Sequence, residues 1–524
     1  MLEAVVLAGI GLRAASGLPP QATAVWPYDS YHDLRWLLVF HNSIPGFLVE
    51  FLVVTGARGL LTAGLTALAW PAQVTRPPFG VLVRRNLMVA AIAGLVISPW
   101  AALSVAFSAV ALSWYLFASL IPMLMLSPFL QRAVVTRHWW RGLPTVELFG
   151  WSLLNFAVLT VAGALSSSAT LWWAVPVAGA AGVANGLLWQ RTVAASVMPA
   201  RVRWPRVPVT PIAVALTMIA AVAAQSVIGL AAGGTQEWRP PVVSELLPDR
   251  VPYAVIAIAG HDSSWDGRPA ADARVERFSY RGLDEQQRPL PYGPRATHRS
   301  VGSSATLLAT HVEALHRRTG RPVALVGESE GATVARSYLE RWPMSPVEAA
   351  VMVSPLVRPG RAYYPPPGHA GWGVVAGWEL RAMLALANIP RPVRNNPDEP
   401  FVRSILANAP FYRNRMLCPV AGVRMVAFVP TVSAAEAPPG ELARIPVVQM
   451  AAFHGGLLGE QVAHDMVIDF LAGEAVDQGR REYVLLQRLG AAWQPPPLPL
   501  AINPIWAADR EGDSSFTGRI CEGR

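Results

Sequence analysis

The stretch "RPVALVGESEGATVARSYLERW", residues 321–342, joins an apolar run to a helix-like segment through a turn of small residues. The short apolar run at 322–326 predicts a buried β-strand. Ser329 lies at the centre of the sequence Gly-Glu-Ser-Glu-Gly. Glycines on both sides of a serine permit a tight strand-to-helix turn, because larger side chains would block the approach of helix and strand. We therefore predict that Ser329 projects from such a turn; the alternative is an ordinary serine in a glycine-rich loop.

The rest of the second half of the chain repeats this alternation of apolar runs and helix-like segments. Short, near-continuous apolar strands between helices indicate a mostly parallel sheet covered on both faces. The expected strands are 253–259, 276–280, 322–326, 349–353, 423–429 and 447–453, and the expected helices are 303–318, 332–341 and 457–471.

The first half has the composition of a membrane protein. Hydrophobic residues make up 52% of the 524-residue chain and charged residues only 15%, and the long apolar runs precede residue 236. A helix needs about 20 apolar residues to cross the hydrocarbon core. Six segments meet this length, and a shorter one at 2–18 is a weak extra span or an interfacial helix. The six expected spans are 47–70, 87–106, 109–130, 147–165, 170–189 and 211–232.

The arginines predict the orientation of these spans. The chain has no lysine and a net charge of +9. Arginines gather in three connections that lie on one side of the predicted bundle, and the alternate connections near 107–108 and 166–169 are uncharged. Basic loops face the cytoplasm, so everything after residue 233 is expected outside it. Their position between spans favours the bilayer over nucleic acid as partner. They are Arg76, Arg84, Arg85, Arg132, Arg137, Arg141, Arg191, Arg201, Arg203 and Arg206.

Polar residues precede and enter the first clear span. The segment 26–42 is interpreted as a polar interfacial segment that docks against the soluble half, with a metal site as the alternative; the candidate ligands are Asp29, His32, Asp33 and His41. Glu50 and Arg58 lie inside or at the edge of the span. Intramembrane charge often marks function, but an ion pair facing the bundle, or side chains that snorkel near a helix end, is the favoured interpretation.

A histidine follows the last expected strand. His454 stands directly after 447–453 and before two glycines, and histidine is the natural base for a serine nucleophile near neutral pH. Residues 250–475 resemble the α/β-hydrolase superfamily of serine esterases, lipases and thioesterases. The resemblance rests on the sequence GESEG, on His454 and on the stretch "VIAIAGHDSSWDG" (255–267). The resemblance implies an α/β-hydrolase fold, with Ser329 as nucleophile and His454 as general base.

The same resemblance implies an oxyanion hole. In the family one donor is the N–H after the nucleophile, here that of Glu330, and another comes from the loop after an earlier strand. This chain has Gly260-His261 where lipase-like members have His-Gly. We place the second donor at His261 or at Asp262.

The acid of the triad is expected between serine and histidine in chain order. After 423–429 the first carboxylate is Glu436 and the second is Glu441, with no aspartate in the expected place. Glu436 is therefore predicted to orient His454, against the alternative of a solvated loop residue. Glu328 is interpreted, like the Glu330 side chain, as a supporting or solvated group.

The expected organisation has four parts. A transmembrane domain at 1–232 is followed by a linker at 233–250, an α/β-hydrolase domain at 251–484 and a Pro-rich tail at 485–524. An insertion at 357–416 is interpreted as a cap over the site or as a surface subdomain. Its Tyr, Trp and Leu content suits an apolar acyl substrate or contact with the bilayer. The two cysteines, Cys418 and Cys521, form a disulfide if the second half is exported, or are unrelated thiols.

Together these features predict a multi-pass cell-membrane protein with an extracytoplasmic serine hydrolase domain. The expected substrate is an acyl ester or thioester, with a lipid as one option, and the acyl group passes through Ser329 to water or another alcohol. No metal or other cofactor is expected. The alternative is a non-catalytic membrane scaffold or transporter whose hydrolase-like domain only binds.

Overall fold

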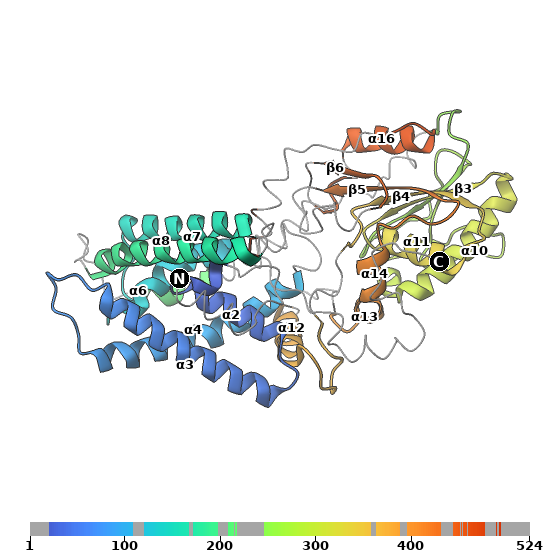
Figure 1. Cartoon of the computed structure of the whole chain (residues 1–524). Helices are drawn as coiled ribbons and strands as arrows, with labels where there is room; N and C mark the ends of the chain where they lie inside the picture. Colours follow the sequence, from blue (N-terminus) through green and yellow to red (C-terminus); the bar gives the residue numbers. More distant parts are fainter. Residues whose placement is uncertain are drawn as a thin grey trace.

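The computed structural model divides into a helical region and an α/β region (Figure 1). It describes residues 20–107, 120–166, 171–197, 208–213, 215–216, 246–357, 363–387, 396–430, 444–450, 452, 454–457, 460–476, 489 and 492–493.

The helical region is a bundle in which α3 packs on α4, α7 packs on α8 and α2 packs on α4. Helix α3 begins after Ser43, whose hydroxyl accepts a hydrogen bond from the N–H of Gly46 and caps the helix. The elements are η2 (Pro20–Thr23), α2 (Tyr28–Val39), α3 (Ile44–Leu68), α4 (Phe79–Phe107), α6 (Ile121–Val135), α7 (Val146–Ser166) and α8 (Leu171–Val197).

Among the described residues, 3 helices are long and apolar enough to cross a membrane: α3, α4 and α7. They coincide with the expected spans 47–70, 87–106 and 147–165. The expected span 170–189 coincides with α8, which is not among these helices. The spans 109–130 and 211–232, and the segment 2–18, lie partly or wholly outside the described residues. The described part of 109–130 overlaps α6, an apolar helix of 15 residues.

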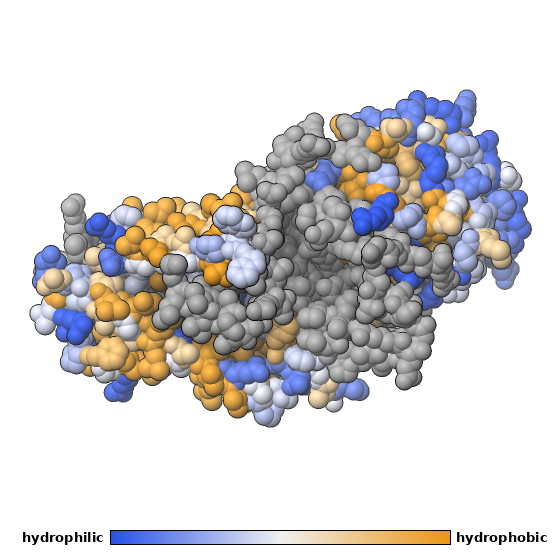
Figure 2. Space-filling view, viewed as in Figure 1, coloured by the Kyte–Doolittle hydropathy of each residue, from blue (hydrophilic) through white to orange (hydrophobic). Residues whose placement is uncertain are grey.

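In the view of Figure 2, hydrophobic residues predominate on the helical region, with hydrophilic residues at its left end and lower edge, whereas hydrophilic residues predominate on the α/β region. Large hydrophobic side chains point outward from several helices, among them Leu48, Leu52, Leu95, Val161 and Leu187. A helix that exposes such residues along its length is suited to lipid rather than to water.

The α/β region contains a six-stranded sheet in the order β2-β1-β3-β4-β5-β6. Every strand pair is parallel, and a strand is present at each of the six places that the sequence predicts. The strands are β1 (Ala254–Ile258), β2 (Val275–Arg277), β3 (Val323–Glu328), β4 (Val347–Val353), β5 (Arg424–Pro430) and β6 (Val447–Met450).

Helices cover both faces of this sheet, because alternate side chains of each strand point to opposite faces. Ile256 and Leu325 pack with helices α10 (Val301–Thr319) and α11 (Glu330–Arg341). Val255 and Val326 pack with α16 (Gln461–Leu471) on the other face. The three helices predicted from the sequence are thus confirmed, with α16 beginning four residues later than expected.

The insertion at 357–416, called the insert below, lies between the two regions (Figure 1). Its helix α12 (Val374–Ala387) packs on α4, and α13 (Pro400–Ala407) packs on α10 and on η4 (Pro294–His298). Helix α14 (Ala409–Arg415) follows α13. His41, after α2, accepts a hydrogen bond on Nε2 from the N–H of Val375 at 2.8 Å. The segment 26–42 therefore contacts the second half of the chain, as expected.

Cys418 is disulfide-bonded, and the described residues include no free cysteine. Cys521, the other cysteine of the chain, lies outside the described residues, as do most of the linker and most of the tail. Trp493 is an exception in the tail: it is fully buried in the helical region, where it stacks on Phe156.

Candidate functional site

Ser329 occupies a strained turn between β3 and α11. Its backbone has φ 52° and ψ −108°, a conformation that residues with a side chain rarely adopt. Both flanking glycines are required there. A Cβ on Gly327 would lie 2.5 Å from the carbonyl oxygen of Gly331, and one on Gly331 would lie 2.2 Å from that of Ile258. The Ser329 N–H donates to the carbonyl of Val353 at 2.9 Å, which fixes the turn to the next strand.

His454 contacts this serine from the segment that follows the edge strand β6. It follows β6, and its Nε2 lies 2.9 Å from the Ser329 Oγ. Both residues are half-buried, so a reactant can still approach the hydroxyl. Burial lowers the pKa of His454 to about 4, which keeps the imidazole neutral near pH 7. A neutral imidazole with its proton on Nδ1 accepts the Ser329 hydroxyl hydrogen on Nε2.

The two predicted oxyanion residues also lie beside Ser329. Glu330 is the first residue of α11, and the turn after β1 brings Gly260 so close that a Cβ there would lie 3.3 Å from the Ser329 Cβ. The N–H of Asp262 donates to Thr297 Oγ1 at 3.0 Å. The N–H groups of Glu330 and His261 have no acceptor among the described residues. Of the two positions considered for the second donor, His261 is therefore the better placed.

Two carboxyl groups are buried next to the serine. Glu328 is 8% exposed and Glu330 is 0% exposed. Burial raises the pKa of Glu328 to about 7, while a hydrogen bond from the Gly260 N–H opposes the rise. Burial likewise raises the pKa of Glu330, and its contact with His261 opposes that rise. Neither side chain is solvated, so the supporting role is the better interpretation for both.

His261 links Glu330 to the insert. Its Nδ1 lies 2.8 Å from Glu330 Oε2, and its Nε2 lies 3.0 Å from Oε1 of Glu399, the residue that precedes α13. Burial alone would lower the pKa of His261, but the hydrogen bonds to Glu330 and Glu399 outweigh it and raise the pKa to about 10. The neighbouring His298 contacts Glu399 Oε2 and Asp262 Oδ1, both at 2.7 Å.

Within the described residues, one group of side chains is close enough to hold a metal ion: His261, Asp262 and His298. The two imidazole rings stack, with centroids 4.6 Å apart and planes at 22°. The lone pair of an imidazole nitrogen lies in the plane of its ring, so two stacked rings cannot both direct lone pairs to one ion. The geometry therefore favours a hydrogen-bonded network over a metal centre.

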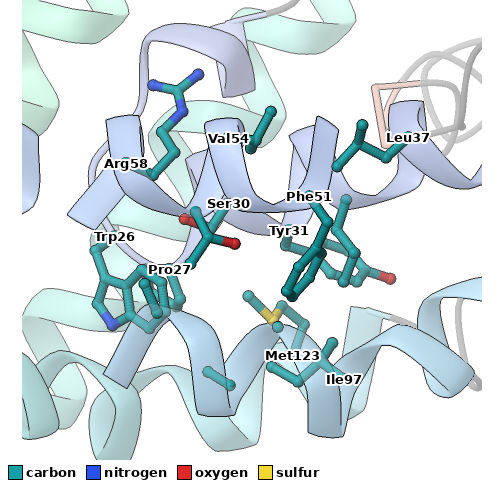
Figure 3. Close-up of a pocket in the computed structure, with 15 residues that line it drawn as sticks. Trp26, Pro27, Ser30, Tyr31, Leu37, Phe51, Val54, Arg58, Ile97 and Met123 are labelled. Carbon is teal, nitrogen blue, oxygen red and sulfur yellow. The ribbon is translucent and has the colours of Figure 1, made fainter. Parts of the chain in front are cut away.

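The candidate metal ligands before the first span, Asp29, His32, Asp33 and His41, do not form a group close enough to hold a metal ion. Asp33 instead pairs with Arg58 of α3, with 2.6 Å between Oδ2 and Nε. The expected ion pair is therefore present for Arg58, whereas Glu50 is exposed. Arg58 also lies at one end of a pocket between α2, α3, α4 and α6 (Figure 3). Mostly apolar side chains line that pocket, including Phe51 and Met123, and none comes from the α/β region.

Ser329, His454, Glu330 and His261 were named from the sequence and lie together in the structure, but Glu399 and His298 were not named. Glu399 stands before a proline that begins a helix, a signal for a helix start but not for its partner. Glu436, the predicted acid, lies outside the described residues, so its role stays a prediction.

In comparisons with known proteins, no family model, no curated protein and no solved structure matches this chain.

Proposed function

We propose that the chain is a membrane-anchored serine hydrolase or acyltransferase of the α/β-hydrolase type. The observation that carries the proposal is the 2.9 Å contact between the Ser329 Oγ and the His454 Nε2 at a strained turn. A positive-φ serine between a parallel strand and a helix is the arrangement of a nucleophile elbow. Strain of this kind persists only where the surrounding structure enforces it, and it is concentrated at functional sites.

In the proposed reaction the Ser329 oxygen attacks the acyl carbonyl carbon while its proton passes to His454 Nε2. The N–H groups of Glu330 and His261 receive the developing oxyanion. The intermediate then collapses, and His454 returns the proton to the departing alcohol or thiol. Water or a second alcohol attacks the acyl-enzyme with His454 as base, which releases the product and restores Ser329. Glu436 is the proposed partner of His454 Nδ1.

The insert supports an apolar acyl group as the substrate. Tyr364, Ala376 and Leu380 of the insert pack in one apolar cluster with residues of α2 and α4, while Phe401 packs in the core of the α/β region. The insert thus connects the candidate membrane helices to the region beside Ser329. A substrate with an acyl chain from the bilayer fits this arrangement, and we extend the proposal to lipid esters and thioesters.

We also propose that the α/β region lies outside the cytoplasm. The arginine-bearing connections of the helical region support this side. The disulfide at Cys418 supports it independently, because disulfides persist in oxidising compartments and are rare in the cytosol.

A fluorophosphonate probe tests the enzymatic proposal on the full chain in detergent or nanodiscs. We expect labelling of the wild type and of Ser303→Ala, an exposed serine of α10, and no labelling of Ser329→Ala. His454→Ala should label at least about 100-fold more slowly, because the base is lost. Absence of labelling in the wild type, or undiminished labelling of Ser329→Ala, would reject the enzyme and favour a binding module or scaffold.

A further inference from the structure

Glu399 is a residue of the insert that contacts the segment at 259–262, which we call the oxyanion segment. The side chain is 7% exposed and its two oxygens contact different histidines. Oε1 lies 3.0 Å from His261 Nε2, and Oε2 lies 2.7 Å from His298 Nδ1. A buried carboxylate is retained only where cationic or hydrogen-bonding partners offset its desolvation. Glu399 therefore depends on the two histidines, and they on it.

The contacts of His261 suit a charged ring. A neutral imidazole carries one N–H, whereas both nitrogens of His261 face carboxylate oxygens, those of Glu330 and Glu399. Both hydrogen bonds are formed together when the ring is an imidazolium. Phe401 of α13 stacks on the same ring at a centroid distance of 4.6 Å, and an aromatic face stabilises a cation. Glu399 and Phe401, both contributed by the insert, thus fix the position and charge of this ring.

The start of α13 is itself held in place. Asp398, the residue before Glu399, receives two hydrogen bonds from Arg381 of α12, at 2.7 and 2.9 Å, and one from Arg403 of α13. Helix α12 is in turn tied to α4 by a 2.6 Å hydrogen bond between Ser98 and Glu379. Glu399 is therefore presented from an insert that is docked on the helical region.

We propose that Glu399 is a positioning residue, which holds the His261 ring so that the His261 N–H stays directed at the oxyanion. The inference rests on the proposed function for its catalytic meaning, because it concerns the second donor of that site. The Gly260 carbonyl accepts a long hydrogen bond from the Ser263 N–H at 3.4 Å, and the Gly260 N–H donates to Glu328. The clamped ring of His261 adds to this restraint on the Gly260–His261 peptide. Undocking of the insert removes Glu399 and disorganises the oxyanion hole.

Two variants of Glu399 and one control variant separate positioning from packing. Glu399→Gln keeps an oxygen that accepts the Nε2–H of His261, Glu399→Leu keeps bulk without an acceptor, and Glu348→Gln changes an exposed glutamate of β4 as control. We expect the rate of fluorophosphonate labelling to fall at least about tenfold in Glu399→Leu, a fraction of the 10²–10³ that a whole oxyanion donor contributes. Glu399→Gln should stay within about threefold of wild type, and the control should be unchanged.

Hydrogen exchange of the oxyanion segment provides a readout that does not need activity. We expect the amides of 259–262 to exchange at least about tenfold faster in Glu399→Leu and near the wild-type rate in Glu399→Gln. Equal rates in all three proteins, or equal loss of labelling in the Gln and Leu variants, would overturn the positioning role. If the wild type is not labelled at all, the proposed function fails, and exchange alone still decides whether Glu399 restrains the segment.

Discussion

The helical and α/β regions expose opposite kinds of residue. In the helical region, Leu52 of α3 is 69% exposed, whereas Asn86 of α4 and Asn155 of α7 are 0% exposed. In the α/β region the strands are almost entirely buried and apolar, with β1 and β3 buried along their whole length. The helical region therefore exposes apolar side chains and buries amides within an apolar interior, whereas the α/β region covers its apolar strands.

This difference indicates that the two regions are built for different solvents. In lipid, exposure of a leucine side chain has no free-energy cost. Amides on the inner side of the helices can donate to backbone carbonyls, as Asn86 does to Leu82 and Val134. In water the apolar strands must be covered on both faces. Two carboxyls are also buried beside Ser329, which is costly in an apolar interior, and we propose that they serve the site.

The largest expected effect compares a glycine in each region. Gly331→Ala should destabilise the α/β region by about 3 kcal/mol and reduce fluorophosphonate labelling at least about 100-fold, because the new Cβ meets the Ile258 carbonyl. Gly64→Ala in α3, where a Cβ meets nothing within 4 Å, should change stability by less than about 1 kcal/mol. Labelling rate and apparent Tm measure both. Normal labelling of Gly331→Ala would show that the tight turn is not needed.

A smaller effect compares two exposed hydrophobic residues. Leu52→Asp should reduce the amount of protein in the membrane fraction, because aspartate near the centre of a membrane helix costs about 2.5 kcal/mol or more. Met344→Asp, in the α/β region, should leave that amount unchanged, although Met344 is 97% exposed. Equal yields of the two variants would contradict the assignment of α3 to the bilayer.

The parts of this comparison that depend on local pattern were predictable from the sequence. The strands were found because a strand buried on both faces is a continuous apolar run, as at Val323–Glu328. The turn at Ser329 was found because only glycine permits the approach seen at Gly327 and Gly331. The pairing of Ser329 with His454 followed from the order of residues along the chain, which the superfamily resemblance supplied.

Features that depend on distant contacts were not predictable. Helix α4 begins at Phe79, eight residues before the expected span, because Arg84 and Arg85 form helix readily but lower the hydropathy. The Arg85 side chain is satisfied by the carbonyl of Val135, a partner that no local pattern indicates. The same holds for Glu399 and His261, which lie far apart in the chain.

The smallest expected effect concerns the buried carboxyl of Glu328. Burial raises its pKa from 4.5 to about 7, so between these values the unfolded chain loses the proton first and stability falls as pH rises. Glu328→Gln imitates the protonated acid and removes this penalty. We expect no change in apparent Tm at pH 4 and a rise at pH 8, where the carboxyl of the wild type is ionised.

The exposed Glu348 provides the matched control, since Glu348→Gln should leave the apparent Tm unchanged at both pH values. A thermal melt of the full chain followed by intrinsic fluorescence makes the measurement. A rise of equal size at pH 4 and pH 8 would show that glutamine improves packing and that ionisation is not the cause. A fall at pH 8 would show that the ionised carboxylate stabilises the folded protein, which would contradict the prediction.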